Sequence, residues 1–274
     1  MHKIVIITNL NKDTDGSVTK KCAKVLESKF DILYDDGTAC EKTKEKLSGA
    51  YAAIVIGGDG TILASSVAAA QCSVPLLGVN LGNLGYLADI ELSHLEDGLE
   101  SFANGNFSVE ERFMLEAVCH SADGKKTVLP ALNDIVISRA SYTRMIALDV
   151  LVDSQFLSSY IGDGIVISTP TGSTAYSLSA GGPVAHPGLD VSIITPVCSH
   201  TLGSKPVIVP GKSDISIRFH KTFDDKSMLT ADGQRAIKIV DGDEITVSAS
   251  KLKTKLIKVT NKTFCEILHK KLQG

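Results

Sequence analysis

Residues 51–70 have the sequence YAAIVIGGDGTILASSVAAA, and this stretch decides the first part of the fold. The apolar run at 51–56 predicts a short buried strand, and residues 62–70 predict a helix. The turn between them, GGDGT at 57–61, is rich in glycine. A strand that enters a helix through such a turn is typical of an open α/β sheet, which binds its ligands there.

Asp59 is the only ionisable side chain in this turn. The neighbouring glycines allow the main chain to approach phosphate oxygens, because they carry no Cβ. A carboxylate beside phosphates is repelled unless it accepts a proton or contacts a metal ion. Asp59 is therefore a candidate catalytic base. The alternative is that Asp59 only stabilises its turn by accepting hydrogen bonds from nearby N–H groups.

A second stretch, TPTGSTAYSLSAGG at 169–182, predicts a strand exit, a turn and a short helix. The apolar run at 165–167 leads into it. Ser173 or Thr174 is expected to cap the helix by accepting a bond from a backbone N–H. The remaining N–H groups and the helix dipole favour an anion at this point. A capped helix whose spare hydroxyls face water would explain the same residues.

The first hundred residues predict a Rossmann-like α/β domain. Short apolar runs predict strands at 3–8, 30–34, 51–56 and 74–79. Val18, Cys22 and Leu26 recur with helical spacing between the first two strands. Strands that alternate with helices indicate a parallel sheet.

From about residue 106 the pattern changes to short alternating apolar runs at close intervals, separated by Gly, Asp, Asn and Ser. This pattern predicts an all-β domain, a sandwich-like stack of antiparallel sheets. Phe264, Ile267, Leu268 and Leu272 then share one face of a final helix. We therefore expect an α/β domain over 1–104, a β-rich domain over 105–260 and a C-terminal helix over 261–274.

The composition of the 274 residues narrows the class of protein. Hydrophobic residues make up 43% and charged residues 22%, which is enough for a sizeable core. The net charge of −3 gives no reason to expect nucleic acid. Six scattered cysteines have no metal-ligand spacing and indicate reduced thiols, so we expect a cytoplasmic protein with no membrane association.

The motifs GGDGT and TPTGSTAYSLSAGGP, in this order, resemble those of the NAD kinase family. This family uses ATP, or a similar donor such as polyphosphate, to phosphorylate the adenosine ribose 2′-hydroxyl of NAD, which gives NADP. Further matching stretches include LGVNLGNLGYL at 77–87, ALND at 131–134 and DGQ at 232–234. The resemblance implies that the last helix returns to the first domain, that donor and NAD meet between the domains, and that the enzyme is a homodimer or homotetramer.

The resemblance also implies a set of site residues. Asp59 would be the base that accepts the proton of the ribose hydroxyl, and Gly60 would face phosphates. The other residues expected to bind NAD are Asn133, Asp134, Arg144, Asp163, Thr174, Ala175, Tyr176, Ser177, Leu178, Ser179 and Gln234.

Several of these residues also have ordinary structural explanations. Asp134 stands where the family usually has Glu, which shortens its reach by one methylene, and it could belong to an Asx turn. Arg144 could be a surface arginine, and Asp163 could be a turn residue. The family often carries a basic residue where this chain has Ile161, so one expected contact to the diphosphate is missing or comes from elsewhere.

A divalent cation, Mg²⁺, is expected to bridge the donor's oxygens, but no residue cluster indicates protein ligands for it. The chain has no Walker A loop and no GxGxxG motif. Two alternatives remain: a GGDGT-type lipid kinase, which would leave the second motif unexplained, and a non-catalytic NAD(P)-binding regulator. Asp59 argues against the regulator, since a phosphate site gains nothing from a nearby anion.

Overall fold

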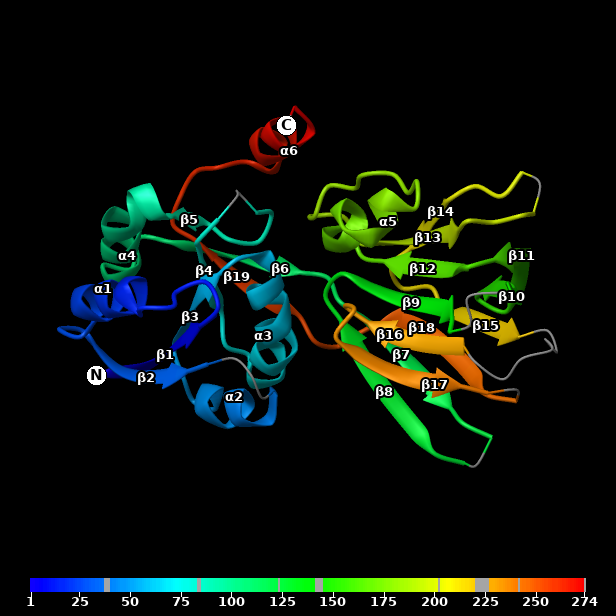
Figure 1. Cartoon of the computed structure of the whole chain (residues 1–274), viewed down its shortest axis with the longest axis horizontal. Coiled ribbons are helices and arrows are strands. Elements are labelled where there is room, and N and C mark those ends of the chain that lie inside the picture. Colours follow the sequence, from blue (N-terminus) through cyan, green and yellow to red (C-terminus); the bar gives the residue numbers. More distant parts are fainter. Residues whose placement is uncertain are drawn as a thin grey trace. The chain divides into compact units, whose positions relative to one another are not determined.

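The computed structural model describes residues 1–36, 40–82, 85–122, 124–140, 145–201, 203–219, 227–240 and 242–273 (Figure 1). The chain divides into two compact units. Unit 1 comprises Met1–Arg112 and Lys253–Gly274, and unit 2 comprises Phe113–Leu252. Unit 2 is thus an insertion in the sequence of unit 1.

Unit 1 is built on a seven-stranded sheet with the order β2-β1-β3-β4-β19-β6 and β5 beside β4. All neighbours are parallel except β19 and β6, which are antiparallel. The strands are β1 (His2–Thr8), β2 (Phe30–Asp35), β3 (Ala52–Gly57), β4 (Leu76–Asn80), β5 (Ile90–Glu91), β6 (Ser108–Arg112) and β19 (Thr254–Lys258). The predicted parallel sheet is therefore confirmed. The domain limits expected from the sequence assign β6 and β19 to the second domain, whereas the structure places both strands in this sheet.

Two pairs of helices pack against each other in unit 1: α1 with α4, and α2 with α3. The α1–α4 pair buries Cys22, Leu26, Leu99 and Phe102 against apolar side chains of the central strands. The bounds are α1 (Ser17–Leu26), α2 (Cys40–Leu47), α3 (Asp59–Cys72), η1 (Leu92–His94), α4 (Leu95–Ala103) and α6 (Phe264–Leu272).

The central strands are apolar because both of their faces are covered. Every residue of β3 is buried, as expected for an interior strand of a parallel sheet. The connection from β2 crosses to β3 on the other side of β1. The carboxyl ends of β1 and β3 therefore flank the point where the strand order reverses, which is the usual ligand site of such sheets.

Unit 2 contains two six-stranded antiparallel sheets. One has the order β11-β10-β15-β18-β7-β8, and the other has the order β14-β13-β12-β9-β16-β17. Their inner faces share one apolar core, so the predicted sandwich-like architecture is confirmed. The bounds are β7 (Leu115–His120), β8 (Lys126–Ala131), β9 (Asp134–Arg139), β10 (Ile146–Val152), β11 (Gln155–Gly162), β12 (Gly164–Ser168), β13 (Val191–Val197), β14 (Val207–Pro210), β15 (Ile215–Phe219), β16 (Ser227–Ala231), β17 (Arg235–Ile239) and β18 (Glu244–Ala249).

The segment after β12 forms two short helical turns, η2 (Thr171–Thr174) and α5 (Tyr176–Ser179), beside β12 in Figure 1. The expected capping by Ser173 or Thr174 is wrong. The residue before α5 is Ala175, and the two hydroxyls instead donate to carbonyl oxygens within the turn, those of Pro170 and Thr171.

The C-terminal helix α6 belongs to unit 1, as expected. Thr263 and Glu266 form a capping box at its start. The ring of Phe264 then packs against Tyr86, with 6.2 Å between ring centroids.

None of the helices formed by the described residues is long and apolar enough to cross a membrane.

Candidate active site

Asp59 is the first residue of α3, directly after the glycine pair that ends β3. Its carboxylate accepts hydrogen bonds from the backbone N–H groups of Tyr86 at 2.6 Å, Leu87 at 3.1 Å and Ala88 at 3.3 Å. Through Asp59, the GGDGT turn is thus hydrogen-bonded to the loop at residues 86–88, which lies 27 to 29 residues further along the chain.

A carboxylate has about four lone-pair positions. The bonds from residues 86–88 use three of them, so one position is left for a further donor such as a hydroxyl group. Because three fixed donors orient the carboxylate, it is pre-organised to accept a proton in one direction.

Glycines make this arrangement possible. A Cβ on Gly85 would lie 2.0 Å from Oδ1 of Asp59, and a Cβ on Gly57 would lie 2.3 Å from Oγ1 of Thr61. By contrast, Gly60 is exposed, and no described atom lies within 4 Å of the position that its Cβ would take. The backbone at Gly60 is therefore open to a ligand.

Tyr86 lies next to Asp59 and is covered by α6. Nζ of Lys271 lies 5.6 Å from the centroid of its ring. Burial and the charge of Asp59 raise the pKa of the Tyr86 hydroxyl, so it stays protonated at neutral pH. Residues of the C-terminal helix α6 thus pack against Tyr86, the residue whose N–H binds Asp59.

In unit 2, Asn133 and Asp134 form the corner that enters β9, and Asp232 fixes this corner from the β16–β17 turn. The Asp232 carboxylate accepts bonds from the N–H groups of Leu132, Asn133 and Asp134 at 2.9, 2.7 and 3.2 Å. The N–H of Asp232 donates to the carbonyl oxygen of Asp134 at 2.9 Å. Asp232 has a positive φ of 55°, a conformation that Asp tolerates better than most residues.

Asp134 is buried, and its side chain lies on the face of β9 opposite the shared core, since Ile135 and Ile137 point into that core. Burial and the charge of Asp232 raise the pKa of Asp134 to about 7. Burial also raises the pKa of Asp232, although its three N–H bonds oppose the shift. A carboxyl group that titrates near neutral pH is typical of a functional site.

The second motif packs directly on this corner. The Thr169 hydroxyl donates to the carbonyl of Leu132 at 2.6 Å, and the Thr169 N–H donates to the carbonyl of Asn133 at 2.8 Å. A Cβ on Gly172 would lie 2.0 Å from that Asn133 oxygen, so this position requires glycine. The corner and the motif thus form one rigid unit.

The six predicted residues from 174 to 179 differ in exposure. Tyr176, Leu178 and Ser179 are exposed, and Thr174 and Ala175 are partly buried. Ser177 is fully buried, and its hydroxyl bonds Oγ1 of Thr195 at 3.0 Å. The Ser177 side chain therefore ties the turn to β13.

Asp163 lies at the other end of β12. In the β9–β12 pairing, Asp134 is opposite Ser168 and Ser138 is opposite Gly164, so about 13 Å of strand separates the two ends. Nε of Arg139 pairs with Oδ1 of Asp163 at 2.7 Å. Burial, and then negative charges that include Asp163 and Asp134, raise the pKa of Tyr176, so this tyrosine lies within electrostatic range of both carboxylates.

The remaining predicted residues are less informative. Gln234 is exposed in the turn that carries Asp232, and its N–H donates to the carbonyl of Ala231. Arg144 lies outside the described residues. The sequence reasoning missed Arg139 as the partner of Asp163, and it chose Gln234 rather than Asp232 from the DGQ stretch. Asp232 did carry a signal, since Asp before Gly often marks a turn with positive φ.

The described part of the chain contains no group of three or more His, Cys, Asp or Glu side chains arranged to hold a metal ion.

Both parts of the chain match family models. Residues 38–107 match the N-terminal domain of ATP-NAD kinases, and residues 132–259 match the C-terminal domain. An NAD kinase from Clostridium botulinum (strain Kyoto / Type A2) is 39% identical over 277 residues, which cover 99% of this chain and 96% of that protein. An NAD kinase from Natranaerobius thermophilus is 37% identical over 283 residues, which cover 100% and 99%.

Solved structures share the fold. A yeast NADH kinase complexed with NADH has a TM-score of 0.87 at 23% identity and covers 100% of this chain and 88% of that one. An NAD kinase from Archaeoglobus fulgidus in complex with ATP has a TM-score of 0.78 at 24% identity, with 97% and 98% covered. With relatives this similar along nearly its whole length, the chain belongs to the NAD kinase family.

Proposed function

We propose that this enzyme transfers the terminal phosphoryl group of ATP to the 2′-hydroxyl of the adenosine ribose of NAD, with Asp59 as the base. A bond forms between the ribose oxygen and the γ-phosphorus, the bond from that phosphorus to the β,γ-bridging oxygen breaks, and the hydroxyl proton passes to Asp59. The products are NADP and ADP. The observation that carries the proposal is the Asp59 carboxylate, which three N–H groups orient beside a glycine-rich turn.

Unit 2 would hold NAD. The Asn133 amide and the Asp134 carboxyl offer donors and acceptors at one corner, which suits a ribose diol or a carboxamide. Asp163, which Arg139 holds in place, would contact a second polar part of the dinucleotide. The exposed residues of the second motif, Tyr176 among them, would supply hydroxyl and main-chain contacts. Arg144, Ser177 and Gln234 remain expectations from the resemblance.

The backbone at Gly60 and Thr61 would face the donor's phosphates at the start of α3, where N–H groups and the helix dipole favour anions. A Mg²⁺ ion that arrives with the donor would be held by phosphate oxygens and water, since the remaining lone-pair position of Asp59 is assigned to the ribose hydroxyl. When bound, Mg²⁺ would neutralise charge on the transferred phosphoryl group. We further propose a cytoplasmic homodimer or homotetramer that uses ATP or polyphosphate as donor.

The experiment that tests this function is direct. The purified protein is incubated with NAD, ATP and Mg²⁺, and NADP is measured with an NADP-specific dehydrogenase. We expect NADP to form in proportion to the enzyme concentration and to disappear when either substrate is omitted. Phosphorylation of lipid vesicles in place of NAD would contradict the proposal, and so would saturable NAD binding without any NADP.

Gly60→Ala tests the contact between the backbone and the donor. Because the Cβ position is open, the melting temperature should stay within about 1 °C of wild type. The methyl group would stand between the backbone and a phosphate, so the KM for ATP should rise about tenfold. The KM for NAD should not change. Steady-state kinetics and a thermal melt check these outcomes, and an unchanged KM for ATP would remove Gly60 from the site.

A further inference from the structure

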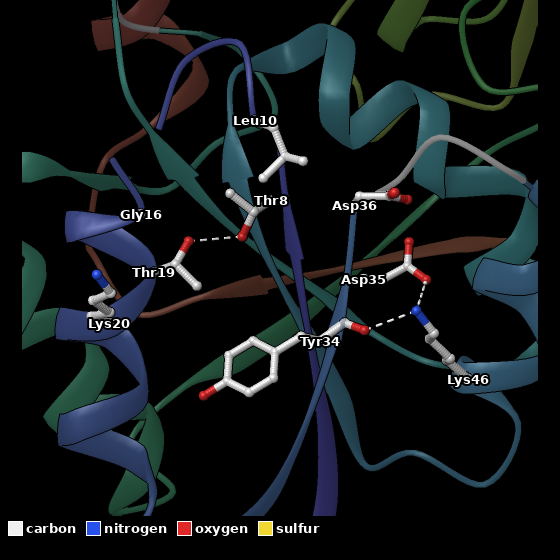
Figure 2. A pocket seen from close by; sticks show the side chains of 9 residues that line it. All are labelled: Thr8, Leu10, Gly16, Thr19, Lys20, Tyr34, Asp35, Asp36 and Lys46. Carbon is white, nitrogen blue, oxygen red and sulfur yellow. Dashed lines mark hydrogen bonds and ion pairs between the residues drawn. The ribbon is translucent and has the colours of Figure 1, made fainter. Parts of the chain in front are cut away.

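Two buried serine hydroxyls stand out in unit 2. Among the described residues, Oγ of Ser168 and Oγ of Ser192 have no hydrogen-bond partner, and both side chains are fully buried. By contrast, the buried Thr8 hydroxyl in unit 1 bonds that of Thr19 at 2.8 Å (Figure 2). A buried polar group without a partner costs free energy, so each of the two serines calls for an explanation.

Ser168 is the last residue of β12, and its side chain lies on the outer face of the sheet. Ile165 and Ile167 of the same strand point into the shared core, so Ser168 points the other way. The residue opposite it on β13 is Ile193, whose side chain cannot form a hydrogen bond. The residue opposite it on β9 is Asp134, which also lies on the outer face. The polar neighbour of Ser168 is therefore Asp134.

The strand pairing brings these two side chains close together. The Thr169 N–H donates to the Asn133 carbonyl at 2.8 Å, so these two residues occupy a hydrogen-bonded position of the ladder. The next position of an antiparallel ladder is non-hydrogen-bonded, with Cα atoms about 4.5 Å apart and the side chains closer than elsewhere. Asp134 and Ser168 occupy that position. A serine hydroxyl there can reach a carboxylate oxygen by rotation of its own side chain.

The Asp134 carboxyl group needs such a donor when it is ionised. Neither of its oxygens accepts a hydrogen bond from the described residues. Its charged neighbour Asp232 is itself an acceptor, and the Arg235 side chain donates to the carbonyl of Pro130. Tyr176 lies within electrostatic range of Asp134, but burial raises the pKa of the Tyr176 hydroxyl, so this group carries no charge at pH 8.

A ligand can approach Asp134 but not Ser168. Asp134 keeps an exposed fraction of 5%, whereas Ser168 has none. The short helical turns η2 and α5 pack on β12. Any influence of the Ser168 hydroxyl on a ligand of unit 2 must therefore pass through Asp134.

We propose that Ser168 is a positioning residue for NAD: its hydroxyl donates to one oxygen of the ionised Asp134 carboxylate and leaves the other oxygen to a hydroxyl of the bound NAD. The bond forms in the NAD complex, since the Ser168 hydroxyl has no partner among the described residues of the free protein. A hydrogen bond to an ionised group is roughly twice as strong as one between neutral groups. This inference rests on the proposed function, in which Asp134 binds NAD.

Ser168→Ala tests the inference by the removal of one oxygen atom. Because that oxygen has no partner in the free protein, the melting temperature should stay the same or rise. NAD binding should weaken about fivefold at pH 8, where Asp134 is ionised. At pH 5 the loss should be less than about twofold, because the carboxyl group is then neutral and bonds the hydroxyl more weakly. Titration calorimetry and thermal melts at both pH values measure these effects.

Ser192→Ala is the matched control. Ser192 is as buried as Ser168 and equally without a partner among the described residues, but its side chain lies on the inner face of β13, as that of Ile194 does. The melting temperature should again stay the same or rise, and the affinity for NAD should equal that of the wild type at both pH values. A similar loss of affinity in both serine variants would show a general effect on the sheet and would overturn the assignment.

The double variant Ser168→Ala/Asp134→Asn shows whether Ser168 acts through Asp134. Without the carboxylate the hydroxyl has no charge to stabilise, so the double variant should bind NAD at pH 8 as weakly as Asp134→Asn alone. Losses of affinity that multiply would show that the two residues act independently, and the proposal would be wrong.

The outcomes separate this inference from the proposed function. If the wild type forms NADP but Ser168→Ala binds NAD at pH 8 with wild-type affinity, the role of Ser168 is wrong and the function stands. If Ser168→Ala weakens NAD binding at pH 8 and not at pH 5, but no donor gives NADP with the wild type, the role of Ser168 is supported and the proposed function fails.

Discussion

Asp59→Asn should lower turnover by about 10²- to 10⁴-fold, because the ribose hydroxyl then lacks a group that accepts its proton. The KM for NAD should change little, since the residues proposed to hold NAD lie in unit 2. NADP production under saturating NAD and ATP, together with NAD binding by calorimetry, checks both statements. Turnover within a factor of three of wild type would show that Asp59 only supports the adjoining loop.

The variant also has a structural cost, which the experiment must separate from the chemical one. In the wild type, three backbone N–H groups donate to the Asp59 carboxylate. In the variant, the Asn amide keeps one acceptor oxygen but places an NH₂ group, itself a donor, close to these N–H groups. We expect a stability loss of about 1–3 kcal/mol.

Asp89→Asn is the matched control for Asp59→Asn. Asp89 also accepts backbone N–H bonds, from Val259 at 2.7 Å and Thr260 at 2.8 Å, and pairs with Lys258. Its replacement should lower the melting temperature at least as much while the folded enzyme keeps its turnover. A comparable loss of turnover in both variants would point to a folding defect rather than to a missing base.

Asp134→Asn should make the protein more stable than wild type at pH 8 and should flatten the pH dependence of its stability. In the folded protein the pKa of Asp134 is about 7, above its ordinary value of 3.8, because burial and the Asp232 charge disfavour the ionised form. Its stabilising contribution is therefore complete below about pH 4 and is lost as the pH rises through 7. The amide of the variant would be neutral at every pH, so the variant loses no stability at this position as the pH rises.

Thermal melts of both proteins at pH 5, 6, 7 and 8 check this prediction. The difference in melting temperature should grow in favour of the variant as the pH rises. Asp190→Asn, at an exposed aspartate of the same unit, is the control and should show the wild-type pH dependence. A constant difference between Asp134→Asn and wild type from pH 5 to 8 would contradict the raised pKa.

The same substitution should cost function where it gains stability. If the ionised Asp134 accepts a hydroxyl of NAD, the affinity of the wild type for NAD should increase as the pH rises through 7. The variant should bind NAD about tenfold more weakly at pH 8, since a charged acceptor is lost, and with little dependence on pH. Titration calorimetry at pH 6 and 8 measures both effects.

Much of unit 1 could be predicted from the sequence because its central strands are buried on both faces. Such strands appear as continuous apolar runs, as β1 and β3 do, whatever their neighbours are. By contrast, β6 and β19 lie at or near the sheet edge and are only partly apolar. Their sequences resemble the half-buried strands of unit 2, and pairing partners nearly 150 residues apart leave no local signal.

A candidate site could be proposed from the sequence where one residue contrasts with its surroundings. Asp59 stands out as a candidate because it is a lone acid among glycines. Its three donors come from a distant loop, and the three bonds of Asp232 cross 98 to 100 residues, so neither set could be inferred from spacing. Ser177 shows a further limit, since a four-residue helix has too little periodicity to tell which side chains point inward.

The position of β19 between β4 and β6 has a consequence for how the polypeptide matures during translation. Every residue of unit 2 leaves the ribosome before this strand does, because unit 2 ends at Leu252 and β19 begins at Thr254. The nascent chain can thus finish both sheets of unit 2 while the sheet of unit 1 still lacks the strand between β4 and β6. A polypeptide released early, at residue 252, would keep the GGDGT segment but present an open strand edge on which other chains can aggregate.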